Sequence, residues 1–140
     1  MFLSKEPPIE GRDNKTINLR GWTFYDQWCA KHGGRHEGKR PRVKLRALKD
    51  EQGDYQEIFI DLIRTHFKNK DFADIARRLR LLPCVKDLLE NSEDAPEVKE
   101  EGRQRKYIFR GMAPDGEKFI VFIQEKKNRL ALLTFYPSHK

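Results

Sequence analysis

The C-terminal third of the chain constrains the fold most, because it contains three short apolar runs separated by turn sequences. The turn Ala113–Gly116 follows Lys106–Met112, and the charged segment Glu125–Arg129 separates Phe119–Gln124 from Leu130–Tyr136. β-Branched and aromatic residues dominate the runs, whereas proline, aspartate and glycine are typical of tight turns. The pattern therefore predicts three consecutive antiparallel strands, a β-meander.

Side chains alternate between the two faces of a strand, which predicts the residues that share a face. In the first strand Lys106, Ile108 and Arg110 lie opposite Tyr107 and Phe109. The last strand divides into an all-apolar set, predicted to pack on the core, and a mixed set. The all-apolar set is Ala131, Leu133 and Phe135; the mixed set is Leu130, Leu132, Thr134 and Tyr136.

Helical patterns precede these strands. Apolar spacing of four, three and four predicts a helix over Tyr55–Phe67 with His66 near its end, and Asp71 is a candidate N-cap for a helix over Phe72–Leu82. Pro83 starts a further short helix, and Ser92–Glu101 is expected to be an acidic loop. Helices followed by strands favour an α+β domain, with N-terminal helices packed on a C-terminal antiparallel sheet of at least three strands.

The first 49 residues are expected to form a basic N-terminal arm attached to the domain over residues 50–140. Met1–Asn18 is polar and without period, and a short aromatic helix is predicted over Thr23–Lys31. The chain has 140 residues and a net charge of +7, which favours polyanions: nucleic acid first, then an anionic membrane surface or an acidic protein. No apolar run is long enough to span a membrane, and no signal peptide is recognisable.

The most basic stretch, Lys31–Lys49, has two interpretations: a solvated loop, or an electrostatic surface for nucleic acid beside the aromatic helix. The predicted nucleic-acid-binding residues are Arg35, Lys39, Arg40, Arg42, Lys44, Arg46, Arg64 and His139. Cys29, His32 and His36 have spacing that suggests zinc ligands, but a structural zinc site needs four ligands, and glycines around the histidines favour a loop.

The sequence contains no glycine-rich phosphate loop and no group of carboxylates at metal-site spacing. Acid–base chemistry by histidine, tyrosine, lysine and arginine, without a metal or cofactor, is therefore the chemistry to expect. RNA suits it, because its 2′-hydroxyl can attack the adjacent phosphate once a base removes its proton and an acid protonates the leaving 5′-oxygen.

From His66 to Pro137, about half of the chain, the sequence resembles the toxin nucleases of the barnase–EndoU–colicin–RelE superfamily. The resemblance lies in the order of a helix-end histidine, the segment Leu82–Asn91, the strand containing Asp115–Ile123, and the closing Leu133–Pro137. Relatives of this kind occur at the C-termini of phage proteins and of contact-dependent inhibition effectors.

The resemblance implies metal-independent RNA cleavage on an open sheet face. His66 would act as general acid or base, Thr134 and Tyr136 would bind the scissile phosphate or assist proton transfer, and Lys106 and Arg110 would stabilise the transition-state charge. It also implies RNA, tRNA included, as substrate, an acidic immunity or antitoxin protein as partner, and action in the cytoplasm, with delivery as part of a larger secreted effector.

Two other hypotheses remain open at this point. The chain could be a non-catalytic nucleic-acid-binding module that holds RNA or DNA through basic and aromatic residues. It could also be an accessory protein of a mobile element that binds another protein through the aromatic cluster Trp22–Trp28.

Overall fold

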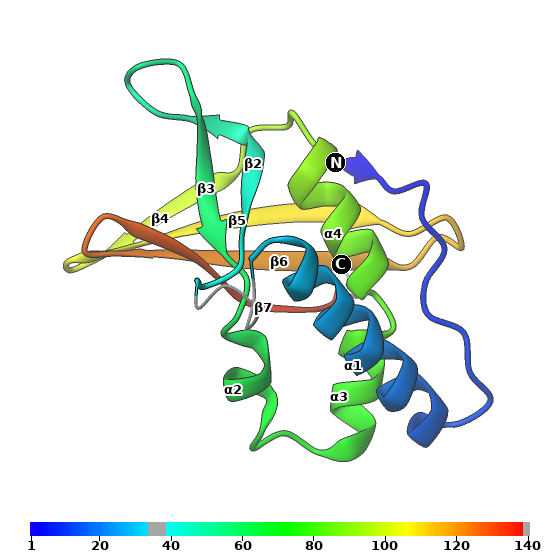
Figure 1. Ribbon diagram of the computed structural model, residues 1–140. Helices are drawn as coiled ribbons and strands as arrows, with labels where there is room; N and C mark the ends of the chain where they lie inside the picture. Colours follow the sequence, from blue (N-terminus) through cyan, green and yellow to red (C-terminus); the bar gives the residue numbers. More distant parts are fainter. Residues whose placement is uncertain (34–38, 139–140) are drawn as a thin grey trace.

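The computed structural model describes residues 1–33 and 39–138. Within these residues the chain forms four helices and a seven-stranded mixed sheet, so the α+β class predicted from the sequence is confirmed (Figure 1). In chain order the elements are β1 (Phe2–Leu3), α1 (Asn14–Lys31), β2 (Arg42–Lys49), β3 (Tyr55–Phe59), α2 (Ile63–Phe67), α3 (Phe72–Leu79), α4 (Leu82–Asn91), β4 (Glu97–Glu101), β5 (Gln104–Met112), β6 (Lys118–Lys126) and β7 (Arg129–Pro137).

The sheet is built around the predicted meander. Its strand order is β1-β5-β6-β7-β3-β2, with β4 also paired to β5, and the β5–β6 and β6–β7 pairs are antiparallel. Strands β1 and β3 pair in parallel with β5 and β7, which makes the sheet mixed. Lys127 and Asn128 both have positive φ, as a two-residue type I′ hairpin requires. The meander prediction is therefore confirmed.

Helices α1 and α4 cover one face of this sheet, in front of β5, β6 and β7, whereas α2 and α3 lie below β7 in this view (Figure 1). The buried cluster joins Tyr25 and Trp28 of α1 to Leu88 and Leu89 of α4 and to alternate residues of the meander. The Tyr25 hydroxyl donates to the carbonyl of Ile60 at 2.6 Å. Residues 1–33 therefore contribute to the same core as the C-terminal strands.

Helix α1 is longer than the sequence predicted. It begins at Asn14, and the Asp13 carboxylate accepts a 2.8 Å hydrogen bond from the Thr16 amide, which is a standard N-cap. The prediction of an irregular arm over Met1–Asn18 is thus wrong from Asn14 onward. In the segment that precedes α1, the Ser4 hydroxyl donates a 2.8 Å hydrogen bond to the Asp87 carboxylate of α4.

The helix predicted over Tyr55–Phe67 is wrong. Its first part is strand β3 and only its last five residues form helix α2. The residues of Lys31–Lys49 from Arg42 onward form strand β2, in which Val43 and Leu45 are buried between exposed cations. Strand β3 pairs with β2 in a hairpin and with the distant strand β7, and these pairings override the local helical spacing.

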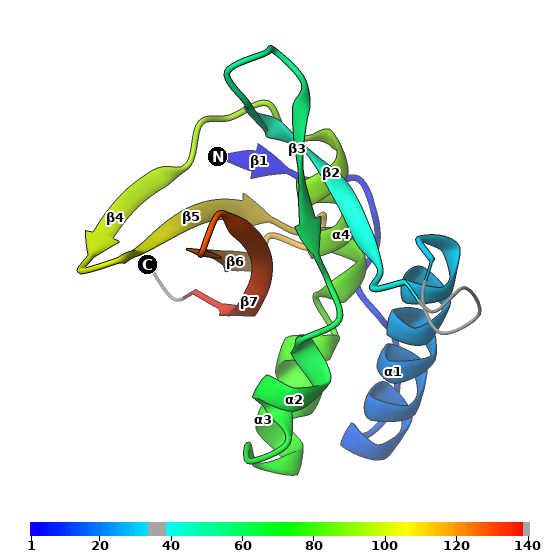
Figure 2. The same ribbon diagram turned by 60° about the vertical axis from the view of Figure 1, so that its left-hand side comes forward.

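Two further expectations are corrected at the edges of the fold. The predicted acidic loop contains strand β4, all of whose residues are exposed and which pairs with β5 along one edge of the sheet (Figure 2). Helix α3 follows Asp71 as predicted, but Phe72 is 56% exposed, and no side-chain cap hydrogen bond forms at Asp71. Helix α4 contains Pro83 in its first turn, which confirms that prediction.

A β-bulge in β7 changes the predicted faces of that strand. Ile123 pairs with Leu132, and the preceding residue of β6, Phe122, pairs with Thr134, so Leu133 is the extra residue. Leu130, Leu132 and Phe135 are consequently buried, while Leu133 is only partly buried. The prediction that Ala131, Leu133 and Phe135 form the core-facing set is wrong, because it assumed unbroken alternation.

A charged cluster fastens the end of α3 to the β5–β6 turn. The Arg80 guanidinium donates to Asp115 at 2.5 Å and to Glu117. This hydrogen bond from Arg80, together with the Glu117 amide, lowers the pKa of Asp115 below its ordinary value. A carboxyl group whose pKa is lower in the folded state than in the unfolded state stabilises the fold at pH values above its unfolded-state pKa. This stabilisation is lost as the pH falls through the folded-state pKa.

We therefore expect the free energy of unfolding of the wild type to fall more steeply below about pH 4 than that of Asp115→Asn. Urea unfolding between about pH 2 and pH 5 measures this difference. Asp54→Asn, a change in an exposed turn, serves as the matched control and should follow the wild type. Parallel curves for the wild type and Asp115→Asn would contradict the assignment.

Candidate nucleic-acid interface

The face of the sheet opposite α1 and α4 is defined by residues that share rows across the strands. One row contains Arg110, Ile120 and Tyr136, and the next contains Ile108, Phe122 and Thr134. Directly opposed residues of a sheet point to the same face. Lys106, Arg110, Thr134 and Tyr136, the four strand residues predicted for the site, therefore share what we call the open face.

Thr134 and Tyr136 meet a residue that the sequence did not single out. Arg78 of α3 donates from Nη1 to the Thr134 hydroxyl at 3.0 Å and to the Phe135 carbonyl at 3.2 Å. Its guanidinium carbon also lies 5.3 Å from the centre of the Tyr136 ring, a cation–π distance. A fixed positive charge thus stands beside the Thr134 hydroxyl and over the Tyr136 ring.

Arg78 is held in place by its own helix. Its Nε donates to Asp74 at 3.2 Å, one turn earlier, and its side chain is only 15% exposed. Burial alone would raise the pKa of Asp74, but the hydrogen bond from Arg77 and the charge of Arg78 outweigh it and lower that pKa. Nη2 of Arg78 has no hydrogen-bond partner in the part of the chain that the structure describes. We refer to Asp74, Arg78, Thr134 and Tyr136 as the Arg78 cluster.

Aromatic rings support this cluster on two sides. The rings of Tyr136 and Phe122 are stacked, with centres 5.6 Å apart and planes at 28°. The Arg78 guanidinium also lies 5.6 Å from the ring centre of Phe67, which contacts Phe135 at 5.4 Å. Phe67 and Phe135 are fully buried, so they fix the position of α2 against β7.

His66 lies immediately before Phe67 on α2, and its side chain is exposed. Among the described residues its imidazole has no hydrogen bond to Thr134 or Tyr136; the Thr134 hydroxyl accepts from Arg78 instead. The sequence predicted an imidazole opposite these two side chains, whereas in the structure the Arg78 guanidinium contacts the Thr134 hydroxyl and the Tyr136 ring.

Lys106 and Arg110 are both neutralised by the edge strand. Lys106 is 3.4 Å from Glu101, and Arg110 is 3.8 Å from Glu97. Arg110 shares its row with Tyr136, two strands away, which is about 10 Å. Lys106 lies in the row of Gln124 and Ala131, about 13 Å along the strand from Arg110. The structure therefore spreads these cations along the face and does not bring them together.

Most of the predicted nucleic-acid-binding arginines also have acidic partners. Each of them pairs with a carboxylate from a different segment, and three also lie over aromatic rings, Arg42 at 5.8 Å from the ring centre of Phe59. The pairs are Arg40 with Asp61 (2.8 Å), Arg42 with Glu57 (3.4 Å), Arg46 with Glu93 (3.0 Å) and Arg64 with Asp26 (2.6 Å); Arg40 lies 3.9 Å from the ring centre of Phe59 and Arg64 4.4 Å from that of Trp22. Lys39 and Lys44 are exposed. Arg35, His36 and His139 lie outside the described residues.

One row of the open face crosses six strands and has cations at both ends. Its members, in order from β4 to β2, are Lys99, Lys106, Gln124, Ala131, Phe59 and Arg42. Five interstrand steps correspond to about 24 Å. Surface ion pairs contribute only about 0–1 kcal/mol, so phosphates could replace the carboxylates that Lys106 and Arg42 contact.

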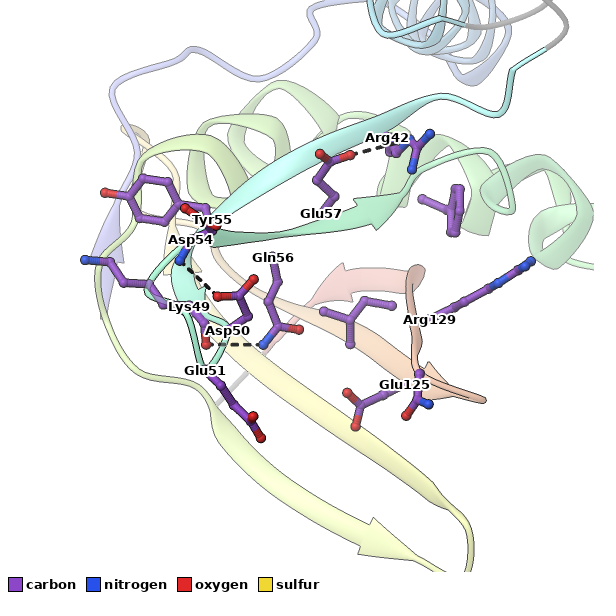
Figure 3. A pocket seen from close by; sticks show the side chains of 13 residues that line it. Arg42, Lys49, Asp50, Glu51, Asp54, Tyr55, Gln56, Glu57, Glu125 and Arg129 are labelled. Carbon is purple, nitrogen blue, oxygen red and sulfur yellow. Dashed lines mark hydrogen bonds and ion pairs between the residues drawn. The ribbon is translucent and has the colours of Figure 1, made fainter.

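A large groove lies between β3 and the β6–β7 hairpin, at the end of this row that contains Phe59 and Arg42 (Figure 3). Its volume is about 960 Å³. Five carboxylate residues line it against three cationic ones, so it is not suited to a polyanion. Of the predicted site residues it contains Arg42, and Figure 3 shows that side chain paired with Glu57. The Arg78 cluster is therefore the better candidate site.

The Arg78 cluster had one signal in the sequence, which is Asp74 four residues before Arg78 on a predicted helix. Arg77 and Arg80 carry the same charge nearby, so spacing could not show which arginine reaches the sheet.

Of the residues in the zinc hypothesis, Cys29 and His32 lie within the part of the chain that the structure describes. Burial raises the pKa of the Cys29 thiol to about 11. Among the described helices, none has the length and apolarity needed to cross a membrane.

Comparison with known proteins does not identify the chain: no protein-family model matches it, and searches of the curated proteins and of the solved structures also find no match.

Proposed function

We propose that this protein is a metal-independent ribonuclease that binds RNA on the open face and cleaves it at the Arg78 cluster. The observation that carries the proposal is the guanidinium of Arg78, fixed by Asp74 and Thr134 and left with Nη2 available beside Tyr136. Preorganised positive charge of this kind stabilises an anion without reorganisation at the moment of reaction.

In the proposed reaction the RNA supplies its own nucleophile. The 2′-oxygen forms a bond to phosphorus while the bond from phosphorus to the 5′-oxygen breaks, which leaves a 2′,3′-cyclic phosphate and a 5′-hydroxyl. One group removes the 2′-hydroxyl proton and another supplies a proton to the 5′-oxygen. We assign these two transfers to His66 and Tyr136, anion stabilisation to Arg78, phosphate contact to Thr134, and positioning of the RNA backbone to Lys106 and Arg110.

The net charge of +7 supports the proposed partners as well. A basic ribonuclease is neutralised most simply by an acidic protein that covers its cations, since complementary charge speeds and orients association. RNA, tRNA included, would then be the substrate and an acidic immunity or antitoxin protein the inhibitor. Action in the cytoplasm, after delivery as part of a larger secreted effector, is part of the same proposal.

The test is incubation of the purified chain with total RNA in EDTA. We expect cleavage that leaves 2′,3′-cyclic phosphate ends, spares a DNA oligonucleotide of the same sequence, and falls about a hundredfold in His66→Ala. Thr65→Ala, an exposed neighbour on the same helix, is the matched control and should cleave like the wild type. Intact RNA after prolonged incubation at high protein concentration would refute the proposal.

A non-catalytic nucleic-acid-binding module is the second candidate. The observation that favours it is the lack of contact between the exposed His66 and the Arg78 cluster, because general acid–base catalysis needs the imidazole within hydrogen-bond reach of the substrate. The same assay separates the two functions, since a binding module retards RNA in a gel and leaves it intact.

A further inference from the structure

On the open face the rings of Tyr136 and Phe122 are stacked, and one side of the Phe122 ring faces away from Tyr136. We propose that Phe122, together with Gln104 and Gln124, forms a subsite for one unpaired nucleobase. The proposal rests on RNA binding by the open face, and it adds the form of RNA that the face accepts: a strand with at least one base free of pairing.

Strand register places the members of the stack on a diagonal of the sheet. Phe122 pairs with Thr134, so Tyr136, two residues further along β7, is its diagonal neighbour on the same face. Arg78 approaches Tyr136 from α3, on the side of β7 away from β6. Tyr136 is thus enclosed by Arg78 and Phe122, and the next position of the stack lies beyond Phe122.

That next position faces the row of Lys106 and Gln124. Gln124 follows Phe122 by two residues on the same strand, so their backbones are about 7 Å apart and their side chains share the open face. Aromatic rings stack with their centres about 4.5–7 Å apart. A flat base placed on Phe122 would therefore have its edge near the Gln124 carboxamide.

The two glutamines offer hydrogen-bonding groups for such an edge. Nε2 of Gln124 donates to Oε1 of Gln104 at 2.8 Å, and both side chains are partly buried. This bond leaves the Gln124 oxygen and its second amide hydrogen available. If both amides are turned over, the Gln104 oxygen and the Gln124 amide hydrogens are available instead, so a donor and an acceptor remain in either case. Carboxamides are a common way of recognising base edges, because they present a donor and an acceptor side by side.

The residues around this position suit a nucleotide whose base is bound while its phosphates remain in solvent. Ile108, which pairs with Phe122 and is two residues from Lys106 on the same face, is 5% exposed and supplies apolar packing next to this position. Lys106 lies opposite Gln124 and can contact the adjoining phosphate. A paired base could not enter, because in a duplex both ring faces are stacked and the pairing edge is occupied.

The experiment measures binding of a short RNA that carries 2′-fluoro groups and so cannot be cleaved. We expect wild-type protein to bind the single strand at least tenfold more tightly than the same sequence in a duplex, and one abasic position to weaken binding about tenfold. A 2-aminopurine at that position should lose fluorescence on binding. In Phe122→Leu both the abasic effect and the fluorescence loss should disappear.

Phe72→Leu is the matched control, because it makes the same substitution at an exposed aromatic residue of α3 that is not part of the open face. It should behave like the wild type. RNA that binds with no dependence on a base at any position, or a duplex that binds equally well, would overturn the subsite and leave the proposed function standing. Failure to bind any RNA would refute both, so the two proposals fail in distinguishable ways.

Discussion

Replacing Arg78 with alanine is expected to slow RNA cleavage by about a hundred- to a thousandfold, the usual cost of removing one preorganised group that stabilises a developing anion. The side chain is 15% exposed and contacts Asp74, Thr134 and the Tyr136 ring, so its charge has one position relative to a phosphate bound at the hydroxyl groups. The loss should appear mainly in kcat, since Lys106 and Arg110 still hold the RNA. Single-turnover cleavage of a labelled RNA in EDTA measures it.

Arg77→Ala provides the control for this prediction, because Arg77 is the adjacent residue, pairs with the same Asp74 and is 65% exposed. We expect it to cleave normally. Arg78 also fastens α3 to β7, and Thr134→Val separates the two roles because it removes the hydroxyl and keeps the side-chain shape. Unchanged cleavage by a folded Arg78→Ala protein would exclude the proposed role. So would a Thr134→Val protein that loses as much stability and as much cleavage as Arg78→Ala, because the lost tether would then explain the whole defect.

Two neighbouring leucines should differ sharply in their effect on stability. Leu132 is fully buried, whereas Leu133 is the extra residue of the β-bulge and is partly buried. Leu132→Ala is expected to lower the free energy of unfolding by about 2–5 kcal/mol, because it removes buried methyl groups and leaves a cavity. Leu133→Ala should cost less than half as much, and urea unfolding of both variants measures the difference.

The substitution is the same at both positions, so each variant is the control for the other. The strict alternation predicted from the sequence gives the opposite order, since it places Leu133 in the core and Leu132 on the outer face. A larger loss in Leu133→Ala would therefore show that the bulge is absent. Equal losses would contradict the assigned register of β6 and β7.

The sequence predicted the parts of the fold that depend on local chemistry. The meander followed from turn residues, among which Gly116 has φ 92° and Asn128 φ 63°, values that glycine and asparagine tolerate well. The start of α4 at Pro83 had a similarly local cause. Strand β3 could not be recognised in this way, because the spacing of Tyr55, Phe59 and Leu62 also fits a helix and only pairing with β2 and β7 decides between them.

The candidate site was predictable to a similar extent. The shared face of Thr134 and Tyr136 follows from alternation, which the bulge preceding Thr134 does not disturb for these two residues. The contact between Arg78 and Thr134 spans 56 residues and depends on how α3 packs against β7, which no local pattern contains. The ion pairs of Arg40, Arg42 and Arg46 are long-range contacts of the same kind.

These ion pairs determine how the surface meets a polyanion. Although the chain is strongly basic, Arg42, Lys106 and Arg110 each have a carboxylate within 4 Å, so the open face presents alternating charge and little unscreened positive potential. A polymer attracted by charge alone gains little there, because each phosphate must first displace a resident carboxylate. Discrimination among RNAs would then depend on the fit of individual nucleotides, and the acidic edge strand β4 would act as a built-in competitor.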